Sequence, residues 1–120
     1  MKYLCLIYSD ERQWATMPRA EYDAVLAEYW AFTEQIRRDG KYVAGEDLEP
    51  TGTAVTIRLR RGRISTTDGP FVETKEQLGG FYLIDAADRD EAIQTASRIP
   101  SARYGAVEVR PVAAPSPSSG

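Results

Sequence analysis

The chain has 120 residues and a formal net charge of −3 at pH 7, from fifteen Lys and Arg against eighteen Asp and Glu. The length suits one domain, 42% hydrophobic with 28% charged residues is ordinary globular composition, and the acidic balance argues against direct nucleic-acid binding. Histidine is absent and there is one cysteine, which excludes His-based catalysis, an internal disulfide and His or Cys-cluster zinc sites. We therefore expect no cofactor and no metal.

The first apolar run, residues 3–8, is too short for a signal-peptide core and ends at a polar cluster. The sequence has no run of about 20 apolar residues, the length that a membrane span needs. We therefore expect a cytoplasmic protein that makes no contact with a membrane. The Pro- and Ser-rich residues 113–120 offer nothing large to bury, so we expect one domain over 1–112 followed by a disordered tail.

The N-terminal third predicts a strand and a long helix. Residues 3–8 are apolar throughout, as in a strand buried on both faces. Thr16 and Pro18 favour a helix start, and Gly40 favours its end. Between them, over residues 19–39, the helical spacing predicts an apolar stripe of Tyr22, Val25, Leu26, Tyr29, Trp30, Thr33 and Ile36.

Four short strands are expected in the middle of the chain. Residues 41–44 are expected to form a short strand before the turn-rich segment GEDLEP, and residues 53–60 alternate between apolar and polar side chains. Arg61 and Gly62 can turn the chain, so residues 64–67 are expected to return as the second arm of a hairpin. Residues 81–84 are again apolar on both faces.

The C-terminal third predicts a helix and a last strand. The spacing of Asp88 and Glu91 matches a capping box, which opens a helix that ends before Pro100. Residues 106–112 alternate, with Val107 and Val109 expected to face inward. The resulting order β-α-β-β-β-β-α-β reduces to βαβ-βαβ with extra short strands, the ferredoxin-like α+β arrangement.

The two central strands of that arrangement, residues 3–8 and 81–84, are the two that are apolar on both faces. Right-handed crossovers place both helices on one face of the sheet, so the other face needs a second cover. We expect a homodimer of the α+β barrel type, sheet against sheet. The alternative is that the loop over residues 67–80 folds across its own sheet.

The least generic segment is TDGPFVETKEQLGG, residues 67–80. Gly69 and Pro70 favour a rigid turn after Asp68, and a single helical turn capped by Thr74 and Gln77 would end at Gly79. A rigid loop of this kind is expected to place four charged side chains around one cavity: Asp68, Glu73, Lys75 and Glu76.

The motif DGPF followed by ETKEQLGGFYLI resembles the YCII-related proteins, specifically their DGPF-motif branch. The start MKYLCLIY, the segment GEDLEP and the closing EVRPV extend the resemblance over most of the chain. The resemblance implies a dimeric α+β barrel of ferredoxin-like topology and a link with extracytoplasmic-function sigma factors. Some YCII-like branches look like enzymes with a His–Asp pair. This chain supplies Asp68 but no histidine, so that mechanism does not transfer.

Asp68 and Glu73 are the candidate general bases, with the alternative that Asp68 only shapes an Asx-type turn. Each candidate ligand-binding residue also has a structural alternative. Lys75 and Glu76 would be solvated loop charges, and Glu46 would lie in a surface turn. Tyr82 would be a core aromatic, and Arg58 would protect the edge of a strand from pairing. In chain order the candidates are Glu46, Arg58, Lys75, Glu76 and Tyr82.

The leading functional hypothesis is a homodimer that binds a small molecule in a cleft beside Asp68, with metal-independent acid–base chemistry as an open extension. Whether the protein is an enzyme is left undecided. The alternative is a regulatory or protein-binding module whose partner is a sigma factor or another protein. A partner protein would contact the arginines of the hairpin, among them Arg58.

Overall fold

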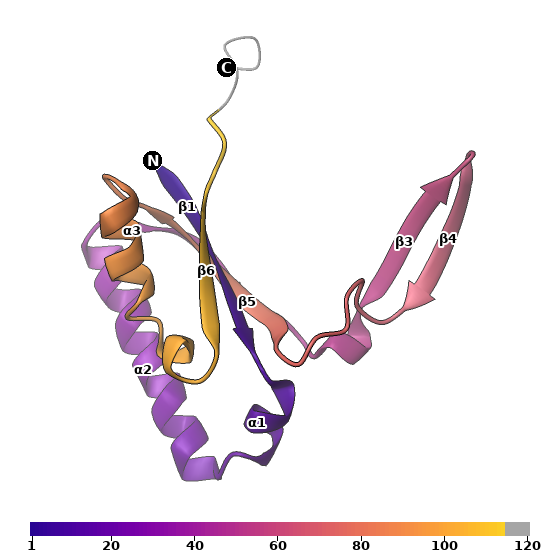
Figure 1. Ribbon diagram of the computed structural model, residues 1–120. Helices are drawn as coiled ribbons and strands as arrows, with labels where there is room; N and C mark the ends of the chain where they lie inside the picture. The colour runs from indigo at the N-terminus through magenta and orange to yellow at the C-terminus, as the bar shows by residue number, and fades with distance from the viewer. Residues whose placement is uncertain (115–120) are drawn as a thin grey trace.

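A computed structural model describes residues 1–114 and contains a four-stranded antiparallel sheet with helices on one face and a hairpin that projects from it (Figure 1). The strand order is β2-β5-β1-β6, so β1 and β5 are central, as predicted. This is the order of the ferredoxin-like fold, and the α+β class is confirmed. The four strands are β1 (Lys2–Ser9), β2 (Tyr42–Asp47), β5 (Gln77–Asp85) and β6 (Ala106–Pro111).

The two main helices, α2 (Arg19–Arg38) and α3 (Arg89–Ala96), cover the same face of the sheet (Figure 1). A short helix that the sequence analysis did not predict, α1 (Glu11–Thr16), follows β1 directly. Its N-cap is Asp10, whose carboxylate accepts from the Arg12 backbone N–H at 3.0 Å. Two short 3₁₀ helices, η1 (Thr51–Thr53) and η2 (Pro100–Arg103), complete the regular structure.

The start of α3 follows its predicted cap. The Asp88 carboxylate accepts from the Glu91 backbone N–H at 2.9 Å, and the Glu91 carboxylate accepts in return from the Ala87 N–H at 3.3 Å. The helix ends at Ala96, earlier than predicted, because the chain leaves the helical path to bury Ile99 and then enters η2 at Pro100.

The core lies between the helices and one face of the central strands. Alternate residues of β1 and β5 point into it and meet α2 and α3, and its largest members are Tyr3, Cys5, Ile7, Phe32, Ile36, Tyr82, Ile84 and Ile99. The predicted apolar stripe of α2 is partly wrong. Phe32, which it omitted, is buried, whereas Trp30 is 73% exposed. Consecutive side chains on a helix point 100° apart, so Trp30 and Phe32 cannot both face the sheet. The side of α2 that packs on the sheet is the one that carries Val25, Phe32 and Ile36.

The other face of the sheet carries large apolar side chains without a helix above it. In the antiparallel register Leu4 lies opposite Leu83, and Leu6 lies opposite Phe81. All four, together with Tyr8, are half-buried. We call Leu4, Leu6, Tyr8, Phe81 and Leu83 the open face. Segment 67–80 does not cover it, because the hairpin that leads into this segment stands away from the sheet (Figure 1).

The projecting hairpin consists of β3 (Val55–Arg60) and β4 (Arg63–Asp68), close to the predicted ranges. Its turn has positive φ at both central residues, Arg61 and Gly62, as a two-residue hairpin loop requires. The radius of gyration is 16.7 Å, well above the roughly 13 to 14 Å expected for a compact chain of this length. The excess reflects the hairpin, which extends from the body.

No helix within residues 1–114 is both long and apolar enough to cross a membrane. Of the predicted tail, residues 113 and 114 are exposed and have no regular structure. The remainder of that prediction, residues 115–120, lies outside the described residues.

Candidate functional site

The two sequence motifs, GEDLEP and DGPF, meet at the base of the β3–β4 hairpin. They enclose a hollow of about 320 Å³, which we call the hairpin-base hollow. Its lining residues come from the segment before β3, from the DGPF turn and from the start of β5, and they are Leu48, Glu49, Pro50, Thr51, Thr53, Ala54, Pro70 and Leu78.

Backbone hydrogen bonds fix the DGPF side of the hollow. The Gly69 N–H donates to the Ala54 carbonyl at 2.7 Å, and the Thr56 hydroxyl donates to the Gly69 carbonyl at 2.9 Å. Gly69 has φ of +103°, a conformation that a side chain would strain. The turn therefore holds Pro70 against the segment that precedes β3.

The other side of the hollow is tied to α1 through Glu11. Its carboxylate accepts from the Thr51 backbone N–H at 2.7 Å and from the Thr51 hydroxyl at 3.0 Å. The Glu11 backbone N–H in turn donates to the side-chain oxygen of Gln77 at 3.0 Å. One residue of α1 thus connects η1 to the start of β5. Local sequence patterns do not reveal this role of Glu11, because its contacts span 40 and 66 positions of the chain.

The helical turn predicted between Thr74 and Gln77 is wrong. The segment is irregular, the Thr74 hydroxyl bonds the Glu76 carbonyl, and the amide of Gln77 donates to the Thr74 carbonyl at 2.6 Å. Because Gln77 also accepts from Glu11, its side chain bridges the loop and α1 instead of capping a helix.

Asp68 is the last residue of β4 and is exposed. It pairs with Val55, next to Ala54 of the hollow, and it lies two residues before Pro70. Within residues 1–114 its carboxylate makes no hydrogen bond and no ion pair. The backbone of Gly69, rather than an Asx-type bond from Asp68, therefore holds the turn.

The remaining loop candidates, Glu73, Lys75 and Glu76, are exposed and do not line the hairpin-base hollow. Lys75 lies within electrostatic reach of Asp10 instead. Arg58 sits on the opposite face of the hairpin from Asp68, and its guanidinium carbon lies 5.0 Å from the centre of the Phe71 ring. None of these four side chains lines the hairpin-base hollow.

Two further candidates belong to the main sheet. Tyr82 is a core residue, 8% exposed, and its phenol oxygen lies 2.8 Å from the Thr33 hydroxyl. Burial raises the pKa of Tyr82, so the phenol stays neutral. Glu46 lies opposite Phe81 in the pairing of β2 with β5 and is exposed. Tyr82 and Glu46 therefore lie on different faces of the sheet.

Asp47, at the end of β2, is a carboxylate that the sequence analysis did not single out. Partial burial raises its pKa, and it lies within electrostatic reach of the phenols of Tyr29 and Tyr82. Burial also raises the pKa of Tyr29, whose hydroxyl bonds the Ser101 hydroxyl. Neither phenol shares a hydrogen bond with Asp47 within residues 1–114; Tyr29 pairs with Ser101 and Tyr82 pairs with Thr33.

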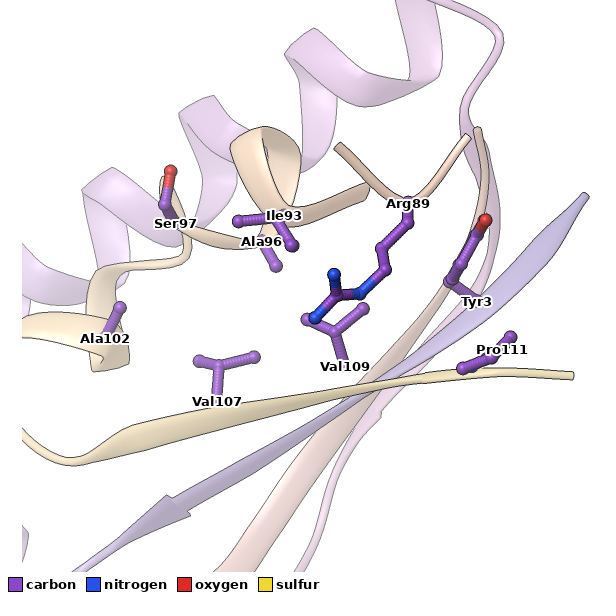
Figure 2. Close-up of a pocket in the computed structure, with 9 residues that line it drawn as sticks. All are labelled: Tyr3, Arg89, Ile93, Ala96, Ser97, Ala102, Val107, Val109 and Pro111. Carbon is purple, nitrogen blue, oxygen red and sulfur yellow. The ribbon is translucent and has the colours of Figure 1, made fainter. Parts of the chain in front are cut away.

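A second hollow, of about 360 Å³, lies between α3 and the edge strand β6 (Figure 2). Val107 and Val109 form one wall, and Ile93 and Ala96 of α3 form the other. The Arg89 guanidinium reaches into this hollow (Figure 2). None of the sequence-predicted site residues lines it.

The hairpin-base hollow combines apolar walls with side chains that carry oxygen atoms able to form hydrogen bonds. Glu49 supplies a carboxylate, and Thr51 and Thr53 supply hydroxyls. Asp68 does not line the hollow itself; it pairs with Val55, the neighbour of the lining residue Ala54. Within residues 1–114, no group of three or more His, Cys, Asp or Glu side chains is arranged to hold a metal ion.

Comparison with known proteins shows the family to which this chain belongs. The model of the YCII-related domain matches residues 1–114. An uncharacterised protein of Rhizobium meliloti (strain 1021) is 40% identical over 115 residues, which cover 94% of this chain and 93% of that protein. The family model thus covers all of the residues that the structure describes. The protein belongs to the YCII-related domain family.

Proposed function

We propose that the protein is a homodimer, formed through the open face, that binds a small molecule in the hairpin-base hollow beside Asp68. The observation that carries the binding proposal is the meeting of GEDLEP and DGPF around one hollow of about 320 Å³. This volume falls within the range of small-molecule sites, which are largely apolar with a few polar groups that orient the ligand.

The walls of the hollow indicate the chemical class of the ligand. Leu48, Pro50, Pro70 and Leu78 offer apolar surface, and the polar groups on the wall carry oxygen acceptors, Glu49 among them. A compact apolar molecule that carries a hydrogen-bond donor or a positive charge fits this combination. Asp68 pairs with Val55, the neighbour of the lining residue Ala54, and would add a second carboxylate for the same polar end.

The dimer is supported by the open face. Five large apolar side chains lie side by side on two central strands, and a second sheet is the simplest cover for them. At about 25 cal/mol per Å² of apolar surface, covering several hundred Å² stabilises the assembly by many kcal/mol. The DGPF-branch resemblance supports the same assembly.

If the protein is an enzyme, a carboxylate would remove a proton from the bound molecule or donate one to it. Asp68 is the first candidate because its carboxylate has no partner within residues 1–114, and Glu73 is the second. This proposal requires no metal and no cofactor.

The binding proposal is tested by ligand-observed NMR with a library of small aliphatic and aromatic amines. Ala54→Leu, which fills the hollow, and Asp68→Asn, which removes the rim charge, should both weaken the binding of any hit. Ala20→Leu, at an exposed position of α2, is the matched control and should bind as the wild type does. Unchanged binding in both site variants would place the ligand elsewhere.

A regulatory, protein-binding module is the second candidate, favoured by the four exposed arginines of the hairpin, Arg58, Arg60, Arg61 and Arg63. The resemblance implies a link with extracytoplasmic-function sigma factors, so the partner would be such a factor or another protein. Reversing Arg58 and Arg60 to Glu should then abolish association with that factor, with no dependence on a small molecule. If Asp68→Asn alters binding of the small molecule and the arginine reversals leave association with the factor unchanged, this candidate is removed.

A further inference from the structure

The β3–β4 hairpin carries an apolar stripe that no other part of residues 1–114 covers. Directly opposed residues of antiparallel strands share a face, and Ile64 lies opposite Leu59. Val55 and Ile57 alternate onto the same face as Leu59. The four side chains are between 55% and 72% exposed, and we call Val55, Ile57, Leu59 and Ile64 the hairpin stripe.

A two-stranded hairpin is marginally stable in water by itself, because it lacks a layer to pack against. All of β4 is exposed, and only Thr56 of β3 is not. Beyond its base, the hairpin extends from the body with no second layer on the stripe (Figure 1). A well-formed hairpin with this much apolar surface indicates that a partner supplies the missing layer.

The charge of the hairpin indicates what that partner is. Residues 55–68 carry four arginines and one aspartate, a net charge of +3, which leaves −6 on the rest of the chain. A basic arm and an acidic body on one molecule are complementary between two copies of it. This favours a second copy of the same chain over an unrelated occupant.

The position of the hairpin points to the same partner. It stands on the side of the sheet away from α2 and α3, which is the side of the open face (Figure 1). One molecule seated against the open face is therefore also within reach of the arm. In a twofold assembly each copy would receive the arm of the other, which is an isologous exchange.

We propose that the β3–β4 hairpin is an arm that packs the hairpin stripe against the body of a second copy of this chain. This inference rests on the homodimer of the proposed function and adds to it the element that clasps the partner. It also has a consequence for the site. Asp68 lies opposite Val55 and so shares the face of the stripe. The partner that covers the stripe therefore also borders Asp68, and the hairpin-base hollow becomes a site between subunits.

The test is sedimentation equilibrium of the full chain over a wide concentration range, with two pairs of substitutions on the hairpin. Ile57→Thr with Leu59→Thr removes apolar surface from the stripe and places a β-branched residue, which suits a strand, at both positions. Ser65→Ala with Thr67→Ala changes the opposite face and is the matched control. We expect the dissociation constant of the dimer to rise at least tenfold in the stripe variant and to stay within about twofold in the control.

A second measurement guards against misfolding of the arm. In wild-type protein, hydrogen exchange of the β3 and β4 amides should slow as the concentration passes the dimer dissociation constant, while β1 and β5 stay protected throughout. Arg58 and Arg60 lie on the face opposite the stripe, so Arg58→Glu with Arg60→Glu changes the charge of the arm and not its apolar contact. This pair should weaken the dimer through long-range electrostatics and reduce its dependence on salt.

Three outcomes distinguish this inference from the proposed function. If Leu6→Lys on the open face breaks the dimer and the stripe variant does not, the arm is refuted and the sheet-to-sheet dimer stands. If the dimer forms but the hairpin amides exchange freely in it, the arm is refuted as well. A wild-type chain that stays monomeric at submillimolar concentration overturns both the arm and the dimer.

Discussion

The carboxylate of Glu11 accepts two hydrogen bonds from Thr51, one from its backbone N–H at 2.7 Å and one from its hydroxyl at 3.0 Å. This contact fastens α1, the first helix of the chain, to the segment that enters the hairpin. It therefore links the main sheet to the hairpin-base hollow, which Thr51 lines.

Glu11→Ala should loosen that link. Hydrogen bonds to charged groups stabilise a fold by roughly 1.5 to 3 kcal/mol each, and partial exposure lowers the value, so we expect a loss of about 1 to 2 kcal/mol in total. Urea unfolding measures the loss, and hydrogen exchange should report a faster Thr51 amide. Glu21→Ala, at an exposed site of α2, should change stability by less than about 0.5 kcal/mol. Equal effects of the two variants would contradict the role of Glu11.

Gly105→Ala should be among the most destabilising single changes. A Cβ at this position would lie 2.1 Å from the Tyr8 carbonyl oxygen and 2.9 Å from the Ser9 Cα, so the backbone of β1 or of the turn before β6 must move. We expect a loss of about 3 kcal/mol, the upper end of ordinary overpacking costs. Gly52→Ala is the control, because nothing lies within 4 Å of its Cβ position. A Gly105→Ala protein with a wild-type melting temperature would rule out this close approach.

Cys5 should be unreactive in the folded protein. Its side chain is fully buried in β1, and burial raises the pKa of the thiol to about 11, so almost no thiolate exists near neutral pH. Titration with a disulfide reagent should detect no thiol in native protein and one equivalent in urea. A Cys5→Ser, Thr67→Cys double variant moves the thiol to exposed β4 and should react at once. Rapid labelling of native wild type would contradict the central position of β1.

The stability of α1 should fall in acid. The Arg12 guanidinium donates to the Asp10 carboxylate, and with the Arg12 backbone N–H it lowers the pKa of Asp10 from 3.8 to about 2. Because the pKa is lower in the folded state, the ionised carboxylate favours folding above the unfolded pKa. That contribution is lost as the pH falls from 3.8 towards about 2.

Urea midpoints measured across that range test the contribution of Asp10. The difference between wild type and Asp10→Asn should shrink as the pH falls. Arg12→Gln removes the largest cause of the shift and should reduce the acid-dependent loss in the same way. A pH profile of Asp10→Asn that runs parallel to the wild type throughout would refute the assignment.

The sequence determined the elements of the main sheet. Apolar runs over residues 3–8 and 81–84 identified the two central strands, and helical spacing up to Gly40 identified α2. The Asp88 capping box opened α3 where it was expected. These predictions succeeded because strand alternation, helix periodicity and caps are local properties that neighbouring residues encode.

The tertiary structure decided which faces are used and which segments meet. Helical periodicity alone did not indicate that Phe32, and not Trp30, is buried in the core. The strand over residues 81–84 is apolar on both faces, so its sequence did not indicate that Tyr82 points toward α2. The hairpin-base hollow joins residues 48–54, 70 and 78, and its tie to Glu11 spans 40 positions. Contacts of this kind depend on how the sheet twists and packs, which the local pattern of the sequence does not specify.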